Sequence, residues 1–115
     1  MSTNTGTNMG LWIDHKLAVI VTMKDPDQTP ETVTVKAHHS QNKETASEIK
    51  HFFDDVLKKL EHAESVLIFG PGEAKDELHK LFKSQHHTAQ IVGIESADKL
   101  TENQVVAKVR DHYNK

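Results

Sequence analysis

The sequence contains no cysteine, which excludes disulfide bonds, thiol catalysis and metal sites built from thiolates. This absence is compatible with a reducing cytosol, and a cytoplasmic location is therefore expected. Arginine is nearly absent as well, because Arg110 is the single arginine among 14 basic residues. Arginine supplies the planar fork that suits phosphate groups. With a formal net charge of −3, the composition predicts no strong autonomous binding to nucleic acid.

The chain also lacks a long apolar run. Residues 17–21 form the longest one, far below the roughly 20 residues that a membrane helix needs. Residues 1–9 are polar, without the basic start and apolar middle of a signal peptide. We therefore expect a disordered tail over residues 1–9, one small domain over residues 10–115, and no membrane partner.

Strand-like segments are defined by β-branched and alternating patterns. Residues 31–37 place Val33, Val35 and Ala37 on one face, which is typical of a half-buried strand. Residues 66–69 are continuously apolar, which indicates a strand buried on both faces. The predicted strands are 11–14, 17–23, 31–37, 66–69 and 90–94.

Three amphipathic segments indicate helices, at residues 45–62, 73–83 and 101–112. Thr45 and Glu48, and likewise Thr101 and Gln104, have the spacing of a capping box at a helix start. The predicted order is βββαβαβα. Closely spaced leading strands suggest an antiparallel meander, and the later β–α–β units need parallel crossovers. The expected fold class is α/β, with a mixed five-stranded sheet and helices packed on it.

Two segments carry a resemblance to a known family. They are the Leu-Trp-Ile-Asp-His run at residues 11–15 and the strand–Gly-Pro-Gly–helix run at residues 66–75, with residues 91–94 in support. Over residues 10–113 the sequence resembles the middle domain of eukaryotic and archaeal class I release factors and Pelota. It is most similar to small bacterial release-factor-like translational machinery proteins. The resemblance implies a ribonuclease H-like fold and an association with translation.

One departure from that family concerns its catalytic loop. The Gly-Gly-Gln motif of release factors lies between the third strand and the first helix, where this chain has residues 38–44. That segment contains Gln41 but no glycine, and no Gly-Gly pair occurs anywhere in the chain. Without glycine the backbone is denied the same open conformations. We therefore expect no peptidyl-tRNA hydrolysis and no catalytic residues.

A ribonuclease H-like fold raises the alternative of a metal-dependent nuclease, which needs several converging carboxylates. Asp14, Glu48 and Glu73 are the candidates, but the end of the fourth strand supplies Gly-Pro-Gly where a further acid is needed. Structural roles explain all three residues: a turn cap, a capping box and a helix-start charge. The adjacent histidine pairs at 38–39 and 86–87 have poor chelating geometry. No cofactor and no metal site are expected.

The turn at residues 70–75 is a candidate anion site. Gly70 and Gly72 permit a tight turn, and the first N–H groups of the following helix attract anions, with Lys75 close by. Glu73 opposes this interpretation because it already places negative charge at the helix start. A small domain that binds a phosphate-bearing ligand here is therefore the alternative function, and a plain strand-to-helix connection is the structural interpretation.

A candidate interaction surface completes the sequence-based picture. Its residues are Trp12, Asp14, His15, Lys75, His79 and Lys83. The last three recur every four positions, which predicts that they share the outer face of a helix. An ordinary solvated face is the favoured interpretation, and a contact with ribosomal RNA within a larger interface is the alternative. Trp12 either covers one end of the sheet or marks a partner or self-association surface. The leading expectation is a non-enzymatic binding protein associated with the ribosome.

Overall fold

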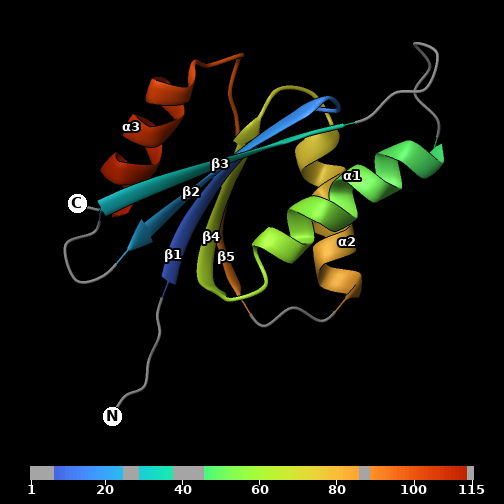
Figure 1. Cartoon of the computed structure of the whole chain (residues 1–115), viewed down its shortest axis with the longest axis horizontal. Helices are drawn as coiled ribbons and strands as arrows, with labels where there is room; N and C mark the ends of the chain where they lie inside the picture. Colours follow the sequence, from blue (N-terminus) through green and yellow to red (C-terminus); the bar gives the residue numbers. More distant parts are fainter. Residues whose placement is uncertain (1–6, 25–28, 38–45, 86–88, 114–115) are drawn as a thin grey trace.

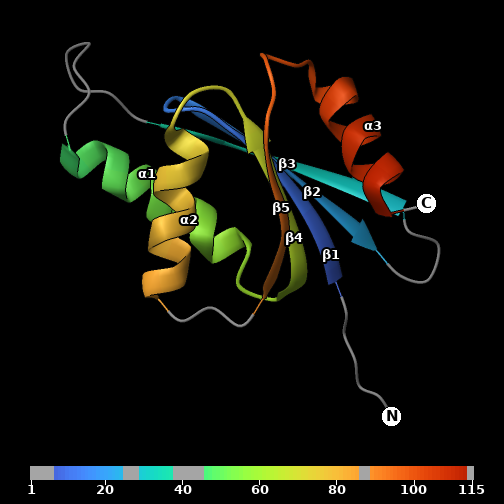
Figure 2. The same ribbon diagram turned by 180° about the vertical axis from the view of Figure 1, so that it is seen from behind.

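The computed structural model describes residues 7–24, 29–37, 46–85 and 89–113. Their elements follow the predicted order βββαβαβα. They are β1 (Thr7–Ile13), β2 (Leu17–Lys24), β3 (Thr29–Lys36), α1 (Ala46–Lys59), β4 (Ala63–Gly70), α2 (Ala74–Ser84), β5 (Gln90–Ser96) and α3 (Glu102–Tyr113). Figure 1 shows this arrangement with the sheet between the helices, and Figure 2 shows it from behind.

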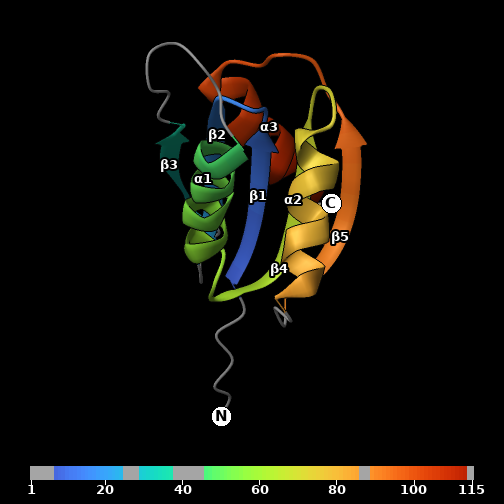
Figure 3. The same ribbon diagram turned by 90° about the vertical axis from the view of Figure 1, so that its right-hand side faces the viewer.

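The five strands form one mixed sheet in the order β3-β2-β1-β4-β5. The pairs β1–β2 and β2–β3 are antiparallel, whereas β1–β4 and β4–β5 are parallel. This confirms the predicted α/β class, with its antiparallel meander followed by parallel crossovers. Helices α1 and α2 cover one face of the sheet and α3 covers the other, as Figure 3 shows with the sheet seen face-on, α1 and α2 in front and α3 behind.

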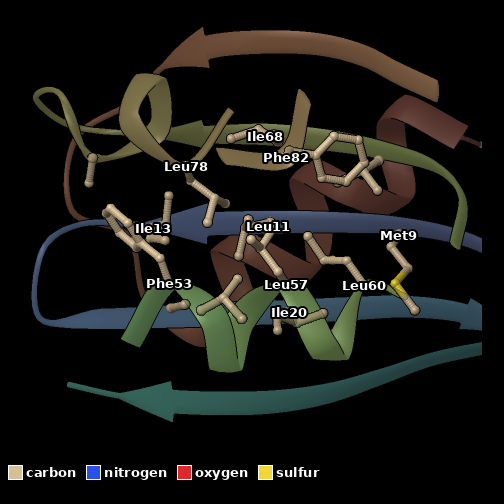
Figure 4. Close-up of a cluster of buried hydrophobic side chains, with 14 of the residues drawn as sticks. Met9, Leu11, Ile13, Ile20, Phe53, Leu57, Leu60, Ile68, Leu78 and Phe82 are labelled. Carbon is tan, nitrogen blue, oxygen red and sulfur yellow. The ribbon is translucent and has the colours of Figure 1, made fainter. Parts of the chain in front are cut away.

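Side-chain alternation along the strands divides the apolar residues between two cores. Leu11 and Ile13 of β1 face α1 and α2, where they meet side chains such as Leu57 and Leu78. Figure 4 shows this first core, in which labelled side chains of β1 lie between those of α1 and those of α2. Val66 and Ile68 of β4 join it as well. The central strands are therefore buried on both faces.

The second core lies between the sheet and α3. Trp12, Leu67 and Phe69 project to this face and pack with Val105 and Val109 of α3. A side chain at Gly10 of β1 is excluded here, because a Cβ atom at that position would collide with the side chain of Val109. The close approach of α3 to the sheet therefore depends on glycine at one position.

The predicted disordered tail is too long by three residues. Strand β1 begins at Thr7, and Asn8 pairs with Met23 of β2 and with Ser65 of β4. Met9 is buried, and the Ser65 hydroxyl donates a 2.9 Å hydrogen bond to Asn8 Oδ1. These polar residues look tail-like in sequence, but their backbone and side-chain partners come from distant strands. Residues 1–6 lie outside the described part of the chain.

Helix α3 begins with the predicted capping box. The backbone N–H of Thr101 donates to Gln104 Oε1 at 2.9 Å, and the N–H of Gln104 donates to Thr101 Oγ1 at 3.1 Å. The corresponding prediction for Thr45 falls outside the described residues. Within the described ranges, no helix is both long enough and apolar enough to cross a membrane.

Candidate functional site

Several of the candidate residues lie at the edge where the parallel strands β1 and β4 end. In open α/β sheets this carboxyl edge is where ligands commonly bind. The β1–β2 turn supplies Asp14 and His15. Gly70 ends β4, and Gly72 lies in the turn between β4 and α2. The structure therefore brings the two sequence segments that carry the family resemblance to one end of the sheet.

Asp14 has a structural role in the β1–β2 turn. Its Oδ1 accepts hydrogen bonds from the backbone N–H groups of Lys16 and Leu17, both at 2.8 Å. Its own N–H donates to the Leu17 carbonyl at 3.0 Å. This is the pattern by which an aspartate side chain stabilises a turn. Among the described residues, no group of three or more histidine or carboxylate side chains is arranged to hold a metal ion.

Gly70 and Gly72 both adopt backbone conformations that favour glycine, with φ angles of 153° and 65°. They differ in their surroundings. A Cβ atom at Gly70 would collide with the backbone carbonyl oxygen of Ile13, whereas a Cβ atom at Gly72 would meet nothing within 4 Å. Gly70 is thus required by close packing of β4 against the end of β1. Its carbonyl also accepts the N–H of Ala97 at 3.1 Å.

Lys75 does not have the position that an anion-binding or basic surface residue needs. Its side chain is buried, with 7% exposed, and its ammonium donates a hydrogen bond to the Gly72 carbonyl oxygen at 2.5 Å. The expected exposed stripe of Lys75, His79 and Lys83 is therefore wrong in its first member. Lys75 faces inward with Ala74 and Leu78. Of the other two residues of the stripe, His79 is half-buried and Lys83 is exposed.

Glu73 occupies the N-cap position of α2, but its side chain makes no capping hydrogen bond. Its backbone carbonyl accepts the N–H groups of Asp76 and Glu77, both at 3.0 Å. The predicted anion site at residues 70–75 therefore has a helix start but no available cation, because the ammonium of Lys75 is hydrogen-bonded to the turn. This geometry favours the strand-to-helix connection over a ligand cradle.

His15 is the candidate residue with a partner that sequence reasoning missed. Its Nε2 lies 2.9 Å from Oε1 of Glu77 on α2, and its ring lies 6.4 Å from that of Phe53 on α1. The side chains of His15 and Glu77 are 38% and 44% exposed. This contact joins the β1–β2 turn to α2 across 62 positions. No sequence signal connects two residues so far apart.

Trp12 belongs to the core and is unavailable to a partner, which corrects its assignment to an interaction surface. Only 1% of the residue is exposed. It lies against α3 in the second core, and its indole Nε1–H donates to the Asp98 carbonyl oxygen. Of the two interpretations from sequence, coverage of the sheet is the one that the structure supports. The histidine pairs at 38–39 and 86–87 and the segment 38–44 lie outside the described residues.

A partly buried polar network, absent from the sequence-based predictions, lies at the opposite end of the sheet. The hydroxyl of Tyr113 donates to the Met9 carbonyl oxygen at 2.8 Å and lies 3.0 Å from Ser65 Oγ, which in turn donates to Asn8. Burial raises the pKa of the Tyr113 phenol above its ordinary value, and the hydrogen bond with Ser65 partly opposes this. These hydrogen bonds connect the end of α3 to β1 and β4.

The fold and this edge define an α/β domain with one mixed five-stranded sheet and three helices. Neither the family models nor the curated proteins include a match to the chain. Solved structures do match. The Thermoplasma acidophilum Pelota protein superposes with a TM-score of 0.71 at 18% identity, covering 95% of this chain and 34% of that one.

Two further structures agree with that similarity. Pelota from Archaeoglobus fulgidus gives a TM-score of 0.67 at 16% identity, over 95% of this chain and 32% of that chain. The archaeal translation termination factor aRF1 gives 0.62 at 12% identity, over 94% and 39%. The chain thus has a Pelota- and aRF1-like fold and spans about a third of the length of those proteins.

Proposed function

We propose that this chain is a non-enzymatic binding domain that associates with the ribosome in the cytoplasm. The observation that supports this most directly is the fold shared with Pelota over nearly the whole chain. A structural model of ribosome-bound archaeal Pelota and ABCE1 also matches, with a TM-score of 0.68 at 21% identity over 91% of this chain. Because fold alone does not fix function, this association is to be tested directly.

The proposal includes the absence of peptidyl-tRNA hydrolase activity. No Gly-Gly pair exists in the sequence to form the catalytic loop of a release factor. The Asp14 side chain at the sheet edge accepts hydrogen bonds from two backbone N–H groups of its own turn. A carboxylate committed to a turn in this way is poorly placed to act on a substrate. These observations favour binding over catalysis.

Co-sedimentation tests the association. Tagged protein from cells of its source, grown normally and under translational stress, is separated on sucrose gradients at modest and raised salt. We expect it to migrate with ribosomal particles, and to dissociate as salt rises if its contacts are to phosphates. Protein that remains at the top of every gradient contradicts the proposal. An unrelated protein of similar size and charge, carrying the same tag, controls for trapping.

Release of labelled peptide from stalled ribosome–nascent-chain complexes tests the absence of hydrolysis. We expect no release above the spontaneous rate. Hydrolysis that disappears in Gln41→Ala contradicts this part of the proposal, while leaving ribosome association intact.

A further inference from the structure

Strand β3 forms one edge of the sheet, and within the described residues nothing pairs with its outer side. It is 8 residues long and pairs with β2 along that length without a register shift. Figure 3 shows β3 at the margin of the sheet, beside α1. A regular, open strand of this kind offers a row of backbone N–H and C=O groups to another strand.

The register identifies which backbone groups face outward. The N–H of Ala37, the residue after β3, donates to the Lys16 carbonyl at 2.9 Å, so this position faces β2. Because direction alternates along a strand, the N–H and C=O groups of Thr32, Thr34 and Lys36 face the open side. Thr34 and Lys36 are exposed, and Thr32 is half-buried.

Two other features restrict where a strand can be added. Pro30 falls at an outward-facing position and has no N–H to donate, which confines pairing to the last part of β3. At the opposite edge, β5 has a register shift in which Val92 has no partner between the pairs Val66–Ile91 and Leu67–Gly93. Bulges of this kind protect an edge from pairing. Of the two edges, β3 is therefore the one open to strand addition.

A positively charged groove of about 400 Å³ runs beside this edge, between β3 and α1. It is lined by Thr34, Val35, Lys36, Asp55, Lys58 and Lys59. Three lysines against one aspartate give it a net positive charge. The neighbouring Val33 is 38% exposed on the same face as Val35, so an apolar strip remains partly uncovered.

We propose that the outer edge of β3 binds an extended acidic peptide segment of another protein by strand addition. Backbone pairing with residues 32–36 would supply affinity, and the lysines and valines beside it would supply specificity. The backbone of an extended peptide carries alternating N–H donors and C=O acceptors that match those along the outer edge of β3, whereas the backbone of RNA has no such pattern. A second copy paired antiparallel would bring its own Lys58 and Lys59 to the same face, so like charges oppose self-association. The proposal does not depend on ribosome association.

The test uses the full chain and an end-capped, fluorescently labelled peptide in which valine and glutamate alternate. The matched peptide alternates valine and lysine. We expect binding of the acidic peptide alone, with slowed hydrogen exchange at the amides of Thr32, Thr34 and Lys36. K58E/K59E should weaken binding by roughly tenfold. K80E/K83E makes the same charge change at exposed positions on α2 and should leave binding within about twofold.

A backbone variant separates strand addition from charge attraction. Thr34→Pro removes an outward N–H without removing a bond to β2, and should abolish binding, whereas Thr34→Ala should bind like the wild type. If Thr34→Pro unfolds the protein, amide protection by the acidic peptide decides instead. Equal binding of the lysine peptide, or no protection at millimolar peptide, overturns the proposal. The proposal is also overturned if an RNA oligonucleotide binds the groove and the acidic peptide does not, or if the protein forms a dimer that Thr34→Pro dissociates.

Discussion

The indole Nε1–H of Trp12 donates a 3.1 Å hydrogen bond to the backbone carbonyl oxygen of Asp98, a residue 86 positions later. Asp98 lies in the connection between β5 and α3. The contact therefore holds that connection against β1, on the face of the sheet that α3 covers.

Trp12→Phe removes this hydrogen bond and leaves space in the second core. We expect a loss of about 1–3 kcal/mol in the free energy of unfolding, from the lost hydrogen bond and the cavity together. Urea denaturation followed by far-ultraviolet circular dichroism measures it, since the variant lacks the only tryptophan. Val92→Ala, at a position 37% exposed, is the control. A Trp12→Phe loss below about 0.5 kcal/mol would contradict the described packing.

Gly70 at the end of β4 and Gly72 in the turn that follows should respond differently to substitution by alanine. Gly72→Ala meets open space and should cost only the backbone strain of a positive φ, about 1–2 kcal/mol. Gly70→Ala adds a collision with the Ile13 carbonyl and should cost more, about 3 kcal/mol or above. Thermal unfolding of both variants makes the comparison. Equal losses would contradict the close approach of β4 to β1 at Gly70.

Asp14 can be tested by exchanging its charge and its hydrogen-bond acceptor separately. Asp14→Asn keeps an acceptor oxygen, so its free energy of unfolding should lie within about 0.5 kcal/mol of the wild-type value. Asp14→Ala removes the acceptor and should lower the free energy of unfolding by about 1–2 kcal/mol. Chemical denaturation measures both. If Asp14→Asn destabilises the protein as much as Asp14→Ala does, the carboxylate has a role beyond accepting hydrogen bonds from the two backbone N–H groups.

Stability at high pH should depend on Tyr113. Its folded pKa is raised above the ordinary value of 10.0, so above pH 10 the unfolded chain releases the phenol proton before the folded chain does. Fewer protons are then bound in the unfolded state, and stability falls as pH rises through this range. Tyr113 is the only tyrosine, so tyrosinate absorbance reports its titration directly.

Tyr113→Phe is the matched variant for that pH dependence. It should lose about 1 kcal/mol at neutral pH, because the Met9 carbonyl loses its donor. Above pH 10 its stability should decline less steeply than that of the wild type. Parallel declines would show that other groups, such as lysines, cause the loss of stability.

Much of the fold follows from local sequence patterns. The continuous apolar run at residues 66–69 and the alternation at residues 31–37 predict strands, and the capping box at Thr101 predicts the start of α3. These signals arise from neighbours within a few positions, where periodicity and hydrogen bonding act directly. Thr7, Asn8 and Met9 were misassigned because their strand character comes from pairing with β2 and β4.

The candidate site was predicted less completely, for the same reason. The turn residues Asp14, Gly70 and Gly72 were found from their local chemistry. The inward position of Lys75 was missed, because a lysine within a polar run carries no sign that its ammonium binds the Gly72 carbonyl. The partner of His15 was missed because Glu77 is brought to it only by the packing of α2.

The sequence by itself determined the order of elements, the mixed sheet, the absence of cysteine and the absence of any Gly-Gly pair, because these depend on composition and short-range periodicity. Tertiary structure alone decided that Trp12 is covered by α3, that Lys75 is buried and that β3 is the regular open edge. Burial and pairing are properties of residues far apart in the chain, and they become definite only when the sheet and both helical layers are assembled.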